Sequence, residues 1–158
     1  MAFVRAGVPT ACVGLTDRSR EIVWVLPNPS FIKGSFGKSE MIEKKINVLI
    51  EDFNTAAKNH YEASLIGDWR TANKNAAIIR KTVKKLRSFG DEGREALLSL
   101  SDSEELSISA MAAVYSLKYA PEKSLSVLNR IAKETSLIGF EAGHAIQGWN
   151  EGTWRLEE

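Results

Sequence analysis

The sequence predicts an all-α protein, a stack of helical hairpins behind a short non-helical leader. After residue 40, apolar residues recur every three or four positions, which is the period of an α-helix. Over the same stretch, glycine and proline fall at the edges of the periodic segments, where helices end. Before residue 41 the composition differs, because three of the four prolines and the single cysteine, Cys12, occur there.

The leader, residues 1–40, is expected to contain loops and one or two short strands. A β-type run, Ile22–Leu26, is followed by the turn signal Pro27–Ser30. We expect a loop over Gly34–Ser39; it resembles the end of a phosphate-binding loop, but Ile32 stands where that motif needs a glycine. Met41 is therefore predicted to begin a helical-repeat domain over residues 41–158. The leader is either an appendage of that domain or an upstream extension foreign to it.

The first two helices are predicted to form an antiparallel hairpin. Helix one should run over Met41–Ile66 and stop at Gly67, and Asp68 is a good N-cap for a second helix that ends at Gly90. The inward stripe of helix one is predicted to be Ile42, Ile46, Leu49, Ile50, Phe53, Ala57 and His60. The inward stripe of helix two is predicted to be Ala72, Ala76, Ile79, Val83 and Leu86.

Four shorter helices are predicted after the hairpin. They are expected over Asp91–Leu100, from a Ser103 cap through Tyr119, from Pro121 through Glu134, and from a Ser136 cap to about Gly148. Leu97 and Leu98 are echoed by Val127 and Leu128, a spacing of about thirty residues that is near the range of helical repeats. A repeat stack must close its terminal core. We expect the tryptophans of the tail, Trp149 and Trp154, to be that lid.

A resemblance to a known family rests on a scattered set of residues in this helical part. They are Gly67-Asp68, Ala72-Asn73, Leu86, Gly90-Asp91-Glu92-Gly93, Ala96-Leu97-Leu98, Ala120-Pro121, Leu125, Leu128, Trp149 and Gly152. Together they resemble a bacterial domain-of-unknown-function family with HEAT-like helical pairs, over about residues 50–154. The resemblance implies an α-α superhelix of the HEAT/Armadillo kind. It brings no established activity, cofactor or catalytic residue.

Charge and composition argue against several classes of protein. The formal net charge of +1 gives no global field to hold a nucleic acid or an anionic membrane. A lone cysteine can form no intramolecular disulfide and no cysteine-based zinc cluster, which favours a reducing, cytoplasmic location. No apolar run reaches the length of a signal peptide core or a membrane span. We therefore expect no membrane association.

Helix two carries the one candidate binding face. Between Trp69 and Gly90 it has seven cations and no acidic residue: Arg70, Lys74, Arg80, Lys81, Lys84, Lys85 and Arg87. At 100° per residue these cations cover somewhat less than half of the helix, opposite the apolar stripe. The face could seek an anionic partner, or it could be a solvated surface balanced by nearby carboxylates, namely Asp91, Glu92, Glu104 and Glu105. The solvated surface is the favoured interpretation.

No catalytic, cofactor or metal site is predicted. The two histidines, His60 and His144, are isolated and have no companion at metal-ligand spacing. His60 falls within the apolar stripe of helix one, where a core or partly buried histidine with a local hydrogen bond is expected. No Gly-x-Ser-x-Gly nucleophile motif occurs.

The sequence therefore favours a non-enzymatic module for protein–protein interaction. Within that class, an immunity or antitoxin-type partner of a toxin is one hypothesis, by analogy with other small helical stacks. The alternative is a nucleic-acid-binding protein, supported by the cations of helix two alone. It is disfavoured because only Trp69 and Phe89, at the ends of that helix, could stack on bases.

Overall fold

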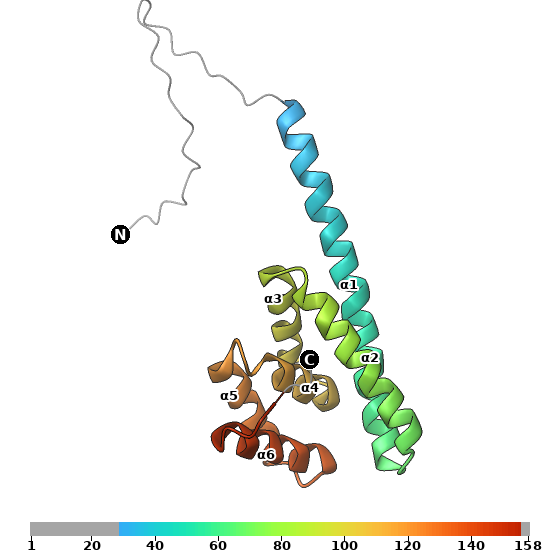
Figure 1. Ribbon diagram of the computed structural model, residues 1–158, viewed down its shortest axis with the longest axis vertical. Helices are drawn as coiled ribbons and strands as arrows, with labels where there is room; N and C mark the ends of the chain where they lie inside the picture. Colours follow the sequence, from blue (N-terminus) through green and yellow to red (C-terminus); the bar gives the residue numbers. More distant parts are fainter. Residues whose placement is uncertain (1–28, 156–158) are drawn as a thin grey trace, which may run out of the picture.

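The computed structural model describes the backbone of residues 29–155 and the side chains of residues 37–155. Every regular element within these residues is helical (Figure 1). The elements are α1 Pro29–Leu65, α2 Trp69–Arg87, α3 Asp91–Ser99, the short 3₁₀ helix η1 Leu100–Asp102, α4 Leu106–Ser116, α5 Pro121–Ile131 and α6 Leu137–Asn150. The all-α prediction is confirmed for this part of the chain. The predicted strand Ile22–Leu26 lies outside the described residues.

Helix α1 begins earlier than predicted. It starts at Pro29, so the expectation that the leader is non-helical is wrong for residues 29–40, and the predicted loop Gly34–Ser39 is helical. Proline suits the first position of a helix, because its φ is already helical and its missing N–H would have no partner there. Extending an existing helix fixes one residue per hydrogen bond, which is much easier than nucleating one. The glycines of this segment therefore do not stop a helix that is anchored further along.

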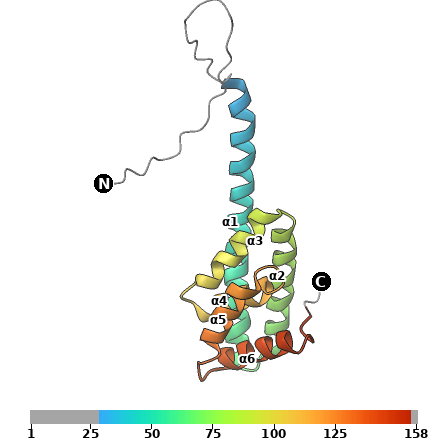
Figure 2. The same ribbon diagram turned by 90° about the vertical axis from the view of Figure 1, so that its left-hand side faces the viewer.

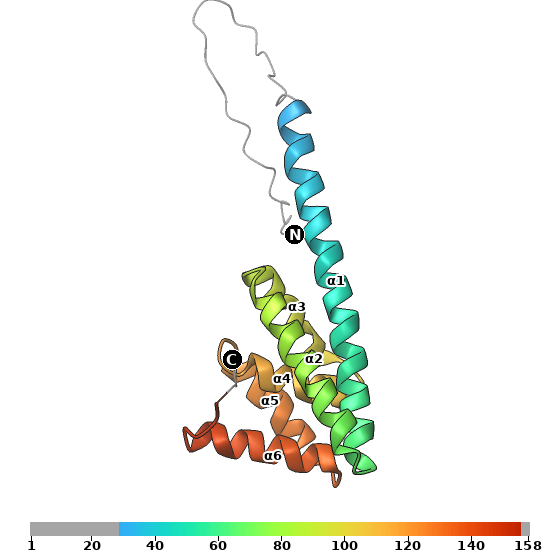
Figure 3. The same cartoon turned by 45° about the vertical axis from the view of Figure 1, so that its right-hand side comes forward.

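Helices α1 and α2 form the predicted antiparallel hairpin (Figure 3). Asp68 caps α2, since its carboxylate accepts a hydrogen bond from the backbone N–H of Thr71 at 3.1 Å. Gly67 takes a φ of +74°, which only glycine adopts readily, and so allows the tight turn. The first hydrophobic core lies mainly between these helices and extends to α3 and α4. Its buried members are Ile46, Leu49, Phe53, Ala56, Ala57, Ile79, Val83, Leu86, Leu97, Ile108 and Ala112.

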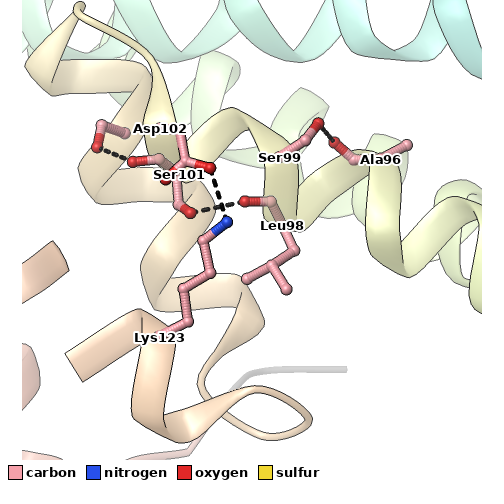
Figure 4. A network of polar contacts seen from close by, with 7 residues as sticks. Ala96, Leu98, Ser99, Ser101, Asp102 and Lys123 are labelled. Atoms are coloured by element: carbon pink, nitrogen blue, oxygen red, sulfur yellow. Dashed lines mark hydrogen bonds and ion pairs between the residues drawn. The ribbon is translucent and has the colours of Figure 1, made fainter. Parts of the chain in front are cut away.

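Helix α4 starts later than predicted. Hydrogen bonds from serine side chains stabilise the segment that precedes it. Ser103 accepts a hydrogen bond from the N–H of Glu105, but α4 begins only at Leu106, after η1. The Ser101 hydroxyl donates to the carbonyl of Leu98 at 2.6 Å (Figure 4), and the Ser109 hydroxyl donates to the carbonyl of Ser101 at 2.6 Å. These bonds satisfy buried hydroxyls. Small side chains at these positions let α4 pack closely on its neighbours.

The second hydrophobic core joins α4, α5 and α6. Its buried members are Ala110, Ala113, Leu117, Val127, Leu128, Ile131, Ile138 and Ala142. Trp149 and Trp154 pack against it with their rings edge to face, 5.6 Å apart. The tail folds back on the end of α6 because the Gly148 carbonyl accepts hydrogen bonds from the N–H groups of Thr153 and Trp154, both at 2.9 Å. The tryptophan lid is therefore confirmed.

Helix α1 reaches well beyond the rest of the helices. Its first turns stand clear of all the other elements in Figure 2, while its second half packs on α2 and α4. Among the described residues, no helix is both long enough and apolar enough to span a bilayer.

Candidate functional site

The outward face of α2 carries a straight row of cations. Arg70, Lys74, Lys81, Lys84 and Lys85 are all exposed, and at 100° per residue they fall within about 100° of the helix circumference. The row is about 22 Å long, from the rise of 1.5 Å per residue. We call these five residues the cation row. Arg80 and Arg87 lie to one side of it.

Nearby carboxylates were expected to balance the charge of this face. Within residues 37–155, no side chain of the cation row takes part in an ion pair. Asp91 pairs instead with Arg94 on its own helix at 2.9 Å, and Glu105 lies 3.8 Å from Lys58 on α1. The five cations are exposed to solvent and have no ion-pair partner among the described side chains.

Large apolar side chains are exposed at the turn between α1 and α2. This turn lies next to the end of the cation row at which α2 begins. Ile66 is 81% exposed, Trp69 68% and Leu65 57%. We call these three residues the apolar tip. The sharp turn at Gly67 and the Asp68 cap hold their backbone in place. Clustered exposed side chains of this size are typical of interaction sites, whereas single exposed ones are not.

The other end of the cation row borders a shallow apolar groove between α1 and α2. Met41 and Val48 of α1 are exposed there, and Phe89, just past α2, forms part of its lining. Lys85 of the cation row lines the same groove, together with Lys44, Lys45 and the acidic Asp52. The outward face of the hairpin thus carries apolar groups at both ends and cations between them.

The two histidines lie apart and serve different contacts. His60 is partly buried, as predicted, and its Nδ1 donates to the backbone carbonyl of Ala72 at 3.0 Å; the bond joins α1 to α2 and is not local in the sequence. His144 stacks edge to face with Phe140 on α6, with 4.4 Å between ring centroids. In the part of the chain with described side chains, no three His, Cys, Asp or Glu side chains are grouped so as to hold a metal ion.

Sequence reasoning found the cation row and Trp69 but missed Leu65 and Ile66. Ile66 was named only as the predicted end of helix one, and Leu65 was not singled out. A signal was present, because Leu65-Ile66 and Trp69 flank a Gly-Asp turn, and apolar residues beside a tight turn have little opportunity to be buried. Phe89, in contrast, packs against the first core, so it cannot serve as a free stacking surface.

Comparisons with known proteins support the fold and leave activity open. No family model matches the chain, and no curated protein matches it. The fold is similar to the crystal structure of the protein RPA1889 from Rhodopseudomonas palustris CGA009, with a TM-score of 0.64 and 21% sequence identity. That similarity covers 71% of this chain and 93% of RPA1889. At this identity, the likeness concerns the arrangement of helices alone.

Proposed function

We propose that this chain is a non-enzymatic protein-binding module, and that the outward face of the α1–α2 hairpin docks an acidic surface of a partner protein. The observation that carries the proposal is the exposure of Leu65, Ile66 and Trp69 directly beside the unpaired cation row. Tryptophan and arginine are the residues most enriched among those that dominate interface energetics. Trp69 and Arg70 stand together here.

The chemistry of this face defines its partner. Apolar side chains at the tip would be covered by apolar groups, while the cation row would attract carboxylates and speed association. The partner should therefore present an apolar patch flanked by a run of Asp and Glu residues. A HEAT-like superhelical stacking of the hairpins, which we propose as the arrangement behind this face, would make the surface rigid. An immunity or antitoxin-type role is the particular case that we propose within this class.

Nucleic-acid binding is the rival function. It is favoured by the cation row, whose length of about 22 Å would span several phosphates at about 3.4 Å per step of one strand. Within the described residues, however, no row of exposed aromatics accompanies the cations, and the apolar tip would have no role against a phosphate backbone. The observations therefore favour a protein partner.

The experiment compares affinity capture by four versions of the full chain in lysate of the native host treated with nuclease. The versions are the wild type, an Ile66→Ser/Trp69→Ser double variant, a charge-reversed variant with Lys74, Lys81, Lys84 and Lys85 changed to Glu, and a Phe140→Ser control. Phe140 is a matched control, since it is 65% exposed on α6, outside the hairpin. The proposal requires a stoichiometric protein, with an acidic surface, that both hairpin variants lose and the control keeps. Capture unaffected by both hairpin variants would contradict it.

A second measurement tests the alternative function, nucleic-acid binding. We expect the purified wild-type protein to show no measurable binding to mixed RNA or duplex DNA at physiological salt. If it does bind, a log-log salt slope near −0.9 for each phosphate contact on duplex DNA, together with loss of binding in the charge-reversed variant, would move the protein to the nucleic-acid class.

A further inference from the structure

A small cavity lies between α1, α4 and α6, away from the outward face of the hairpin. Its volume is about 270 Å³. Most of its wall is apolar and is formed by Ala57, Ala110, Met111, Val114, Ile138, Ala142 and Ala145. Ligand pockets for drug-sized molecules usually measure roughly 300–1,000 Å³. This cavity therefore suits a smaller ligand whose body is apolar and about the size of one ring.

Two of the four polar groups in the cavity lining, His60 and Glu141, offer hydrogen-bond acceptors, and the other two are hydroxyls. A carbonyl oxygen only accepts, so the bond from His60 to Ala72 requires the proton to be on Nδ1. In the neutral ring, Nε2 is then an acceptor, and among the described residues it has no partner. Glu141 adds a carboxylate to the same lining. The Ser107 hydroxyl donates to Glu105 Oε1 at 3.3 Å and can still accept, whereas the Tyr61 hydroxyl can either donate or accept.

Among the described residues that line the cavity, Glu141 is the only acidic one, and none is a lysine or an arginine. Its side chain remains open to solvent on one side. Burial on the other side nevertheless raises the pKa of the carboxyl. A carboxylate in this position lacks a full hydration shell, so a cationic donor would stabilise its charged form.

We propose that this cavity binds a small primary ammonium compound with an apolar body, with Glu141 and His60 Nε2 accepting hydrogen bonds from the ammonium group and the apolar wall enclosing the body. Two acceptors, one of them charged, select a cationic donor over an anion. The site is independent of the hairpin face, so a single chain could bind both a protein and this ligand.

The test is an NMR titration of the full-length protein with three probes of the same shape: benzylammonium, benzyl alcohol and benzoate. We follow the methyl resonances of Ala110, Met111 and Ala142, which line the cavity. Benzylammonium should give saturable shifts, benzyl alcohol should bind at least about tenfold more weakly, and benzoate should not bind, because a charged hydrogen bond is worth more than a neutral one. Equal binding of the amine and the alcohol would overturn the proposal, as would the absence of saturable shifts.

Variants assign the binding to these groups. Glu141→Gln keeps the shape of the side chain and should reduce the affinity for benzylammonium about tenfold, to that of benzyl alcohol. Glu122→Gln is the matched control, because Glu122 is an exposed acid in the first turn of α5 and is absent from the cavity lining; it should leave the affinity unchanged. Ala145→Leu should fill the cavity and abolish the shifts, and circular dichroism establishes that this variant is folded. Unchanged affinity in Glu141→Gln would overturn the proposal.

Discussion

Gly93, in the first turn of α3, packs against the backbone carbonyl of Leu86 near the end of α2. A Cβ atom at position 93 would overlap that carbonyl oxygen and its carbon. The carbonyl belongs to the main chain, so it cannot move aside as the end of a flexible side chain would. This contact determines how closely α3 packs against α2. Leu86 itself is fully buried in the first core.

Gly93→Ala is therefore expected to destabilise the protein by about 1–3 kcal/mol, the usual cost of overpacking. Gly143→Ala is the matched control. Gly143 lies inside α6, and a Cβ there would meet nothing within 4 Å. Alanine should stabilise the helix at that position by about 0.5–1 kcal/mol. Urea denaturation of both variants measures the two changes, and a Gly93→Ala protein as stable as the wild type would contradict the packing described here.

Local signals explain what the sequence predicted well. The Asp68 cap, the Gly67 turn, Pro121 in the first turn of α5 and the Ser136 cap depend on groups only a few residues apart, and the structure contains all four. The inward stripe of α2 follows the helical period, although Ala76 is only partly buried. Helical periodicity similarly placed the cation row on one face.

Features that depend on distant parts of the chain were not predictable. The length of α1 depends on helix propagation from a segment that is anchored in the core. The glycines near the start of α1 predicted a loop instead. The exposure of Leu65 and Ile66 depends on which turn the later helices leave uncovered. The meeting of His60 with Glu141 in one cavity joins residues about eighty positions apart, and no spacing rule brings them together. The stacking of the hairpins as a superhelix stays a prediction.

Truncation of one central leucine in either core should strongly destabilise the protein. Leu97 lies in the first core and Leu128 in the second, and neither is more than 1% exposed. Leu97→Ala and Leu128→Ala are each expected to lower the free energy of unfolding by about 2–5 kcal/mol. Chemical denaturation measures both. Changes below about 0.5 kcal/mol at both sites, the range of surface positions, would refute the inward register of α3 and α5.

Removal of residues 1–40 should leave a cooperatively folded protein. The side chains of residues 37–40 are exposed, and the first core begins with the partly buried Ile42 and the buried Ile46. The deletion therefore shortens α1 without removing a described core contact. Thermal unfolding followed by circular dichroism is the measurement. Deletion of residues 1–53 is the contrasting case. It also removes Ile46, Leu49 and Phe53, so it should abolish the cooperative transition. Loss of that transition in the shorter deletion would mean that the leader is part of the core.

The raised pKa of Glu141 predicts a pH dependence of stability with a definite sign. Burial raises the pKa of this carboxyl above its ordinary value of 4.5, so the folded state holds the proton more tightly than the unfolded state. The stabilising effect of that proton is complete below the unfolded pKa and is lost as the pH rises through the folded pKa. The other polar groups that line the cavity, among them His60 and Tyr61, are unchanged in the variant used for the test.

Glu141→Gln removes this titration, so its melting temperature relative to the wild type should be higher at about pH 7 than at about pH 4. Differential scanning calorimetry of both proteins at the two pH values gives this difference, and the comparison cancels the titration of every other carboxylate that the two share. Glu122→Gln, an exposed change on α5, should show the same relative melting temperature at both pH values. A relative melting temperature of Glu141→Gln that stays constant or falls toward pH 7 would mean that the protein does not disfavour the charged form of Glu141.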